Sequence, residues 1–203
     1  GAVRVLITAG PTREPIDPVR YLSNRSTGGM GFALARAAMR RDHQVLLVLG
    51  PVEGQPPVGA EVYGVETARE MLDAVLDFLP WADAVLCAAA VSDYRPARAA
   101  ASKLKRGSFT SLELVENPDI AAAVGERKGE RPLVVFALET DDGVVHAKDK
   151  LARKNADFCV LNGPDAIGAD RAAFVLVRRD GTSLDLGELT KDELADRLFD
   201  LLQ

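Results

Sequence analysis

The sequence contains little cysteine and no long apolar run. Its two cysteines, Cys87 and Cys159, both lie inside short apolar segments of the 203-residue chain. We interpret them as small core side chains and not as a disulfide or a metal-binding pair, which favours a reducing compartment. No run of about 18 apolar residues and no secretory signal is visible, so the sequence predicts a cytoplasmic protein without a membrane-spanning helix.

Positive charge is scarce as well. Lysine and arginine total 25 against 30 acidic residues, which gives a net charge of −5. Because nonspecific nucleic-acid binding depends on many contacts between cations and phosphates, this balance argues against a nucleic-acid partner. Any local cluster of cations in so acidic a chain is therefore informative.

The remaining composition fits one domain spanning residues 1–203. A hydrophobic content of 47% suffices for a sizeable core, and the length is ordinary for a single domain. Residue 1 is a glycine and not an initiating methionine. We therefore expect the chain to be part of a longer protein.

Short apolar runs alternate with helical patterns, which is typical of a parallel sheet with crossover helices. We expect an α/β fold with a Rossmann-like, mostly parallel sheet, flanking helices and a C-terminal β-hairpin. The predicted strands are Val3–Thr8, Gln44–Leu49, Ala84–Ala89, Leu133–Ala137, Asp157–Leu161, and the hairpin Phe174–Arg178 and Ser183–Leu186 turned at Asp180-Gly181. The predicted helices are Gly29–Arg41, Thr67–Leu79, Pro118–Arg127, Val144–Lys154 and Lys191–Leu202, with capping-box patterns at Thr67 and Thr190.

A long loop follows the first predicted strand. Residues 10–29 separate that strand from the first helix, and loops this long inside a domain are usually functional or disordered. The loop carries arginines ahead of Gly28, Gly29 and Gly31, which open a helix. Such an arrangement is typical of a site for a charged ligand. Glycines that only allow tight helix packing are the alternative.

The segment between residues 95 and 115 interrupts the alternation. Residues 95–107 are rich in alanine and basic side chains, and we expect them to form a flexible flap. Residues 107–115 contain the strand-like Ser108–Leu114 and are expected to form an arm that pairs with a second subunit. The flap carries the cationic run Lys103–Arg106, which either holds phosphates or simply faces solvent.

Further candidates stand at the ends of predicted elements. Ala88–Asp93 follow the third strand, at the edge where open α/β sheets bind ligands. Asn117 is the predicted cap of a helix that starts at Pro118. Lys150 and Lys154 share one helix face. Each has a structural alternative. Asp93 could be an ordinary turn aspartate, Asn117 an ordinary helix cap, and the two lysines could lie on a surface helix that pairs with nearby acidic residues.

Several segments occur together in one order along nearly the whole chain. They are Ile7–Glu14, Asp17–Asn24, Met30-Gly31, Ala89–Tyr94, Lys103–Lys105, Asn117–Ile120, Phe136–Thr140, and Lys150 with Lys154-Asn155. Together they resemble the phosphopantothenoylcysteine synthetase family, the phosphopantothenate–cysteine ligases of coenzyme A biosynthesis.

The resemblance implies a ligase that forms an amide between 4′-phosphopantothenate and L-cysteine. CTP would activate the carboxylate as an acyl-cytidylate, with Mg²⁺ on the triphosphate and a homodimer as the working form. In most bacteria the resembled domain follows a flavin-dependent decarboxylase in one fused chain, and such a fusion would fit the expectation of a longer protein.

The same resemblance assigns roles to individual residues. Asn24 would hold the acyl-nucleotide, and Lys103 would stabilise the first transition state; these two are the predicted catalytic residues. Arg20, Asn24 and Gly31 would contact the substrate. The nucleotide would be bound by Cys87, Ala88, Ala89, Asp93, Lys103, Asn117, Pro118, Asp119, Ile120, Phe136, Lys150 and Lys154. No metal-binding residue is assigned.

The chain departs from the family at a few positions. Gly29 stands where the family often has a lysine, Leu138 where a small alanine is common, and Arg106 where a lysine is frequent. These departures leave open a paralogous synthetase that acts on another carboxylic acid. The choice between CTP and ATP also stays open.

Two other classes of function fit less well. A dinucleotide-dependent reductase is disfavoured because the glycines lie far from the first strand and the expected Tyr/Lys pair is absent. A non-catalytic nucleotide-binding module would not need Asn24, Lys103, Lys150 and Lys154 together.

Overall fold

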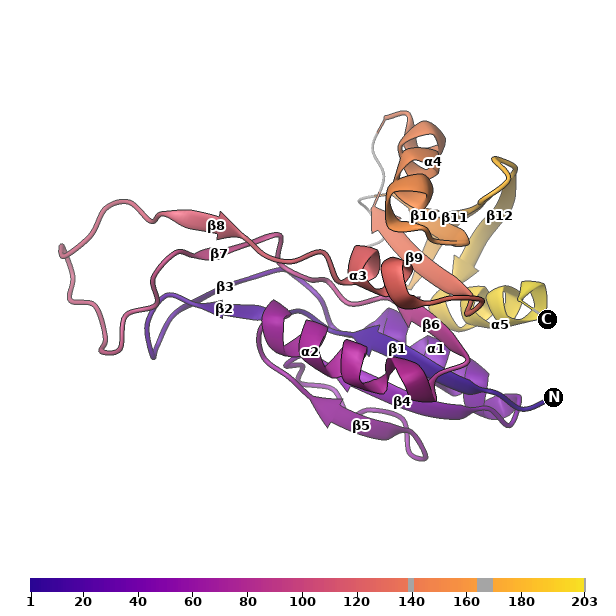
Figure 1. Cartoon of the computed structure of the whole chain (residues 1–203), viewed down its shortest axis with the longest axis horizontal. Helices are drawn as coiled ribbons and strands as arrows, with labels where there is room; N and C mark the ends of the chain where they lie inside the picture. Colours follow the sequence, from indigo (N-terminus) through magenta and orange to yellow (C-terminus); the bar gives the residue numbers. More distant parts are fainter. Residues whose placement is uncertain (139–140, 164–169, 203) are drawn as a thin grey trace.

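The apolar runs form one central sheet (Figure 1). The computed structural model describes residues 1–138, 141–163 and 170–202. In spatial order the eight strands are β12 (Ser183–Thr190), β11 (Arg171–Arg178), β10 (Phe158–Asn162), β9 (Leu133–Leu138), β6 (Ala84–Cys87), β1 (Arg4–Ala9), β4 (Gln44–Leu49) and β5 (Glu61–Gly64). Neighbouring strands from β5 to β10 in this order pair in parallel, whereas β11 pairs antiparallel with both β10 and β12. The predicted α/β fold with a C-terminal hairpin is confirmed.

Helices cover both faces of the sheet. One face is covered by α1 (Gly29–Arg40) and α5 (Lys191–Leu201), whose buried Leu34 and Leu198 belong to the same apolar cluster. The other face is covered by α2 (Ala68–Phe78), α3 (Ile120–Arg127) and α4 (Gly143–Lys154). Because both faces are covered, β1 and β4 are almost entirely apolar and buried instead of alternating between apolar and polar.

The capping patterns work as local signals for two helices. At α5, the Thr190 side chain accepts from the backbone N–H of Glu193 and the Glu193 carboxylate accepts from that of Thr190, which is a complete capping box. At α2, the Thr67 hydroxyl accepts from the Glu70 backbone N–H, while its own proton goes to the Glu70 carboxylate. The predicted capping box is thus confirmed at α5. At α2 the bond from the Glu70 backbone N–H to the Thr67 side chain is present, which is one of the two bonds of a capping box.

Several short strands were not predicted from the sequence. Strand β5 lies at the edge of the sheet and has only four residues, all of them exposed, so no buried apolar run marks it. The long loop after β1 contains a small hairpin of β2 (Arg13–Pro15) and β3 (Tyr21–Ser23). A second small hairpin joins β7 (Tyr94–Pro96) to β8 (Leu114–Glu116). Three-residue strands are too short for periodicity to reveal.

These two hairpins form a projection, defined as residues 12–23 and 94–116, that extends away from the sheet on the left of Figure 1. The expected strand over Ser108–Leu114 was wrong, because only Leu114 of that range belongs to a strand. Strand β8 pairs with β7 of the same chain, so its pairing does not require a second subunit.

The buried Asp17 carboxylate ties the two halves of the projection together. It accepts from the backbone N–H groups of Val19, Arg20 and Leu104, and the Arg20 guanidinium donates to it twice, at 3.1 and 2.8 Å. These bonds, led by that from Leu104, lower the pKa of the Asp17 carboxyl well below its ordinary value. The segment expected to be a flexible flap is therefore anchored at Leu104 in this conformation.

We expect Asp17→Asn to loosen this anchor. An amide places N–H groups against the donors that the carboxylate serves, so the melting temperature should fall and proteolysis between residues 97 and 113 should become faster. Because the folded-state pKa is lowered, the carboxylate stabilises wild type at pH above the ordinary aspartate value of 3.8 and this contribution is lost as the pH falls below it.

Melting curves between about pH 2 and pH 6 would test this, because the loss begins below 3.8 and continues toward the lowered folded-state pKa, and the variant should lack it. Asp180→Asn is the matched control, because the pKa of Asp180 is also lowered but by Thr182 in a distant turn. Equal proteolysis of the projection in wild type and Asp17→Asn would contradict the anchor.

Candidate functional site

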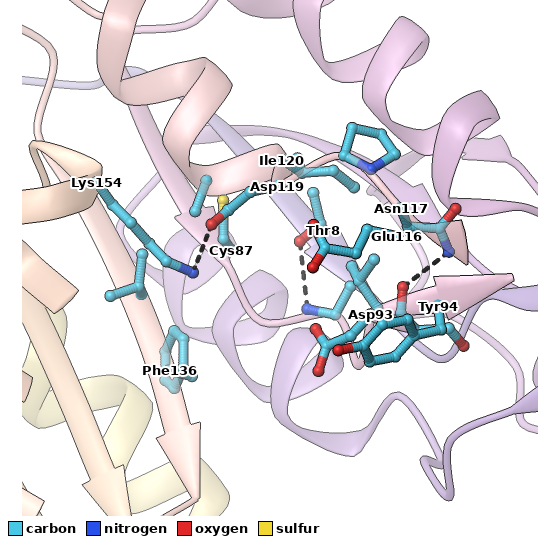
Figure 2. A pocket seen from close by; sticks show the side chains of 16 residues that line it. Thr8, Cys87, Asp93, Tyr94, Glu116, Asn117, Asp119, Ile120, Phe136 and Lys154 are labelled. Carbon is cyan, nitrogen blue, oxygen red and sulfur yellow. Dashed lines mark hydrogen bonds and ion pairs between the residues drawn. The ribbon is translucent and has the colours of Figure 1, made fainter. Parts of the chain in front are cut away.

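The first cavity opens where β6 and β9 end, at the carboxyl edge of the parallel strands. Its volume is about 410 Å³, within the usual range for small-molecule sites. Figure 2 shows its labelled side chains converging from β1, the β6–β7 connection, the start of α3, β9 and the end of α4. It is lined by Thr8, Cys87, Ala89, Val91, Ser92, Asp93, Tyr94, Glu116, Asn117, Pro118, Asp119, Ile120, Ala121, Val135, Phe136 and Lys154.

Small side chains line the part of the cavity contributed by the sheet. The Thr8 hydroxyl at the end of β1 accepts from the backbone N–H of Ala89, at 3.2 Å, and holds the chain as it leaves β6. Desolvation raises the pKa of the neighbouring Cys87 thiol to about 12. The thiol therefore stays protonated and contributes space and apolar surface instead of a nucleophile.

The start of α3 differs from the prediction. Asn117 is not the cap: α3 begins at Ile120, and the Asp119 side chain caps it by accepting from the backbone N–H of Ala122 at 3.0 Å. The Asn117 amide instead donates to the Ser92 carbonyl and accepts from Arg95. Asn117 therefore holds the helix start against the chain that follows β6, as Figure 2 shows.

Lys154 reaches the cavity from the opposite side. Its ammonium lies 3.3 Å from the Asp119 carboxylate. The backbone sets this position: a Cβ at Gly125 of α3 would lie 1.8 Å from the Lys154 carbonyl oxygen, and Asn155 donates to the Gly125 carbonyl. Only glycine allows α3 and α4 to approach so closely, and that approach places a cation beside the helix start.

A second cavity, of about 650 Å³, lies along the long loop and the start of α1. It is lined by Pro11, Arg13, Tyr21, Ser23, Asn24, Arg25, Ser26, Thr27, Gly29, Phe32, Pro51, Val52, Glu53, Gly54 and Gln55. The Asn24 amide donates to the carbonyls of Ala90 and Val91, at 3.4 and 3.1 Å. Since Val91 lines the first cavity, Asn24 connects the walls of the two cavities.

The structure brings most of the predicted nucleotide-binding residues together. Cys87, Ala89, Asp93, Asn117–Ile120, Phe136 and Lys154 all line the first cavity. Ala88 packs against the core instead of lining it. Lys103 and Lys150 line neither cavity: Lys103 is exposed on the projection, and Lys150 lies on α4 one turn before Lys154.

Two of the predicted substrate contacts have structural roles here. The Arg20 guanidinium is held by Asp17 and also donates to the Leu104 carbonyl. Gly31 is buried where α1 crosses β1, and a Cβ on it would lie 2.2 Å from the Ala9 Cβ. The helix-packing alternative weighed for the glycines therefore describes Gly31, which lines neither cavity.

Other lining residues were not among the predicted site residues. Ser92 is 6% exposed, and its hydroxyl has no hydrogen-bond partner within the described part of the chain. A buried hydroxyl without a partner is costly, so one lining a cavity is consistent with a bound ligand or water. Thr8 could have been proposed from its place at the end of the first strand, whereas a serine in a turn carries no such signal.

The described residues contain no preformed metal cluster, since no group of three or more His, Cys, Asp or Glu side chains is placed to hold an ion. No helix among residues 1–138, 141–163 and 170–202 is long and apolar enough to span a bilayer. Two residues of the motif Phe136–Thr140, Glu139 and Thr140, lie outside the described residues.

Comparisons with known proteins agree with the resemblance seen in the sequence. Residues 2–203 match the family described as the DNA/pantothenate metabolism flavoprotein C-terminal domain. The chain is 40% identical, over 98% of its length, to the coenzyme A biosynthesis bifunctional protein CoaBC of Mycobacterium tuberculosis. It spans about half of that relative, 51% of its residues.

Solved structures share the fold. The crystal structure of the C-terminal domain of a coenzyme A biosynthesis bifunctional protein CoaBC superposes with a TM-score of 0.85 and 38% identity, covering 99% of this chain and 96% of that one. A Cab2 mutant in complex with phosphopantothenate-cysteine superposes with a TM-score of 0.76, covering 98% of this chain and 86% of that one. Its 17% identity supports similarity of fold alone.

Proposed function

The chain belongs to the DNA/pantothenate metabolism flavoprotein C-terminal domain family, and from this premise we propose that it is a ligase joining 4′-phosphopantothenate to L-cysteine in coenzyme A biosynthesis. The carboxylate of the acid attacks the α-phosphate of CTP, which forms an acyl-cytidylate and releases pyrophosphate. The cysteine amine then attacks the acyl carbon, forms the amide and releases CMP. Nucleotide activation is needed because a carboxylate is a poor acceptor for an amine.

The observation that carries this proposal is the first cavity. It combines small side chains at the sheet edge, the start of α3 and a cation, Lys154, in a volume of about 410 Å³. Backbone N–H groups at a helix start and a lysine both suit phosphates. We place the nucleotide there, with its base and ribose near Asp93 and Asn117 and its triphosphate toward Lys154.

The other two predicted lysines, Lys103 and Lys150, do not line this cavity in the described conformation. Lys150 precedes Lys154 by one turn of α4, so the two lysines lie on the same face of the helix. Lys103 adjoins Leu104, whose backbone N–H is bound by Asp17. We propose that Lys150 adds to the binding of the triphosphate and that Lys103, carried by the projection, stabilises charge at phosphorus in the first step.

Asn24 is proposed to serve the second step. Its amide bridges the walls of the two cavities, so an acyl-cytidylate extending from the first cavity into the second would pass beside it. This place suits a residue that orients the acyl group for attack by the amine. The acid would then occupy the second cavity.

A Mg²⁺ ion would accompany the triphosphate. Magnesium in nucleotide sites takes most of its ligands from phosphates and water and needs only one or two protein carboxylates. Asp93 and Asp119 line the first cavity and supply such oxygens. When bound, the ion would neutralise charge on the phosphates.

We also propose that the working form is a homodimer built through the projection. The projection carries several exposed large apolar side chains: Val19, Tyr21, Tyr94, Phe109 and Leu114. Exposed apolar residues gathered on one extended element are typical of an interaction surface. Because the chain spans about half of the bifunctional relative, we further propose that a flavin-dependent decarboxylase accompanies this ligase in the full-length protein.

The test mixes the purified chain with CTP, Mg²⁺ and 4′-phosphopantothenate and then adds cysteine. Pyrophosphate should appear only when the acid is present, and CMP and the amide should follow only after cysteine is added. Parallel reactions with ATP, and with other carboxylic acids, distinguish a different nucleotide or a paralogous substrate. Absence of pyrophosphate with every nucleotide and acid would refute the ligase and favour a non-catalytic binding module.

A further inference from the structure

The small hairpin of β2 and β3 (Figure 1) turns one face toward the second cavity. Arg13 of β2 lies opposite Ser23 of β3, so their side chains share a face, and Tyr21 stands two positions before Ser23 on that same face. All three residues line the second cavity. Glu14 points the other way: it is buried and its carboxylate accepts from the backbone N–H of Ala68. The alternation of the strands therefore presents Arg13 to the cavity.

The Arg13 side chain is held in place without a carboxylate. Its guanidinium carbon lies 4.5 Å from the centre of the Tyr21 ring, which is within the range of a cation–π contact. In the described part of the chain the guanidinium makes no ion pair and donates no hydrogen bond, although Glu53 lines the same cavity. Elsewhere arginines such as Arg36 pair with carboxylates, in that case Asp192. A partly buried guanidinium that is stacked in this way keeps its five N–H donors for a ligand.

The other polar groups of this wall leave an anion to the arginines. The hydroxyl oxygens of Ser26 and Thr27 accept from the backbone N–H groups of Gly28 and Gly29, so the N–H groups ahead of α1 already have partners. Arg25 is the second guanidinium that lines the cavity. The positive charge of this cavity therefore resides in arginine side chains, in a chain whose net charge is −5.

We propose that Arg13 binds the phosphate ester of 4′-phosphopantothenate through two of its N–H donors, and that it thereby selects the phosphorylated acid over the free one. The inference rests on the proposed ligase function, which places the acid in the second cavity. A guanidinium presents its donors as a planar fork that matches two phosphate oxygens. Stacking on Tyr21 holds this fork before the ligand arrives, which lowers the cost of ordering it on binding.

The carboxylate of the acid is the other anion that such a fork could bind. Its place is proposed to be beside Asn24, which follows the last residue of β3, whereas Tyr21 is the first residue of that strand. The guanidinium stacked on Tyr21 is therefore set apart from the acyl group. This separation suits a ligand that carries its carboxylate and its phosphate at opposite ends.

Calorimetric titrations with three ligands test the inference. They are 4′-phosphopantothenate, pantothenate, which lacks the phosphate, and 4′-phosphopantothenol, in which an alcohol replaces the carboxylate. Arg13→Ala should weaken binding of both phosphorylated ligands by roughly ten- to a hundredfold and leave pantothenate unchanged. Arg69→Ala is the matched control, because Arg69 is an exposed arginine on α2 that lines neither cavity.

A second variant, Arg13→Lys, separates the shape of the fork from its charge. Lysine keeps the positive charge but offers a point charge instead of two parallel donors, so it should recover only part of the affinity that Arg13→Ala loses. Full affinity for 4′-phosphopantothenate in Arg13→Lys would overturn the paired contact.

The remaining outcomes are separable. Unchanged binding of 4′-phosphopantothenate by Arg13→Ala overturns the inference. An equal loss for all three ligands also overturns it, because that would show a structural role, and a loss confined to the two carboxylic acids would assign Arg13 to the carboxylate instead.

The same titrations distinguish this inference from the ligase proposal. If wild type binds the phosphorylated ligands through Arg13 yet releases no pyrophosphate with any nucleotide, the ligase proposal fails and the phosphate contact stands. If wild type releases pyrophosphate but binds pantothenate as tightly as 4′-phosphopantothenate, the ligase stands and the inference on Arg13 fails. If wild type binds none of the three ligands, both are overturned.

Discussion

Lys154→Gln should weaken CTP binding by roughly ten- to a hundredfold and leave the melting temperature of the free protein nearly unchanged. The Lys154 side chain is only 18% exposed, and its ammonium lies beside the start of α3, where the triphosphate is proposed to bind. A charge-assisted hydrogen bond removed from such a place costs affinity. The carboxylate it faces, Asp119, is 46% exposed, so losing that ion pair in the free protein costs little.

The measurement is a CTP titration beside a thermal melt, with Lys148→Gln as the matched control on the same helix. A second variant, Gly125→Ala, tests whether the position of Lys154 matters, because it leaves the charge of Lys154 unchanged. Its methyl group would collide with the Lys154 carbonyl oxygen, so α4 must move away from α3 and CTP binding should weaken too. Full CTP affinity in Lys154→Gln would remove this lysine from the site.

Asn24→Asp should slow amide formation about a hundredfold while acyl-cytidylate formation slows much less. The Asn24 amide donates to two backbone carbonyls between the cavities. A carboxylate of the same shape cannot donate and repels those oxygens, so the loop and any acyl group beside it lose their orientation. The first step, in contrast, depends on groups around the phosphates in the first cavity.

Single-turnover measurements separate the two steps, because pyrophosphate reports the first and CMP the second. Ser23→Ala is the control for a general loosening of the loop, since the Ser23 hydroxyl donates to the backbone carbonyls of Thr12 and Asn24, at 2.8 and 3.3 Å, and not to Ala90 or Val91, which the Asn24 amide holds. An equal loss of both steps in Asn24→Asp would contradict the assigned role. So would a Ser23→Ala variant that reproduced the same split.

The main elements of the sheet could be predicted because their signals are local. Strands such as β1 and β4 are continuous apolar runs, and Thr190 and Glu193 stand at the spacing of a capping box. The fold and the family are confirmed, and the residues proposed for the nucleotide mostly line one cavity. Strands in parallel α/β sheets run toward a common edge, so residues that follow them converge.

Contacts between distant segments could not be read in the same way. Arg20 looked like a ligand for an anion because no local pattern shows that the backbone of Leu104, 84 positions later, will meet both Arg20 and its neighbour Asp17. The cap of α3 shifted from Asn117 to Asp119 because Ser92 and Arg95, over twenty positions earlier, occupy the asparagine amide. Gly31 is small because β1 passes within contact of α1.

The sequence by itself determined the order of elements, the α/β class and the identity of the side chains at the sheet edge, since these follow from hydrophobic pattern and local hydrogen bonding. Only the tertiary structure decided which cations reach a cavity. Lys154 does so because Gly125 lets α3 and α4 touch. Such close approaches depend on backbone positions far apart in the chain, which no local pattern encodes.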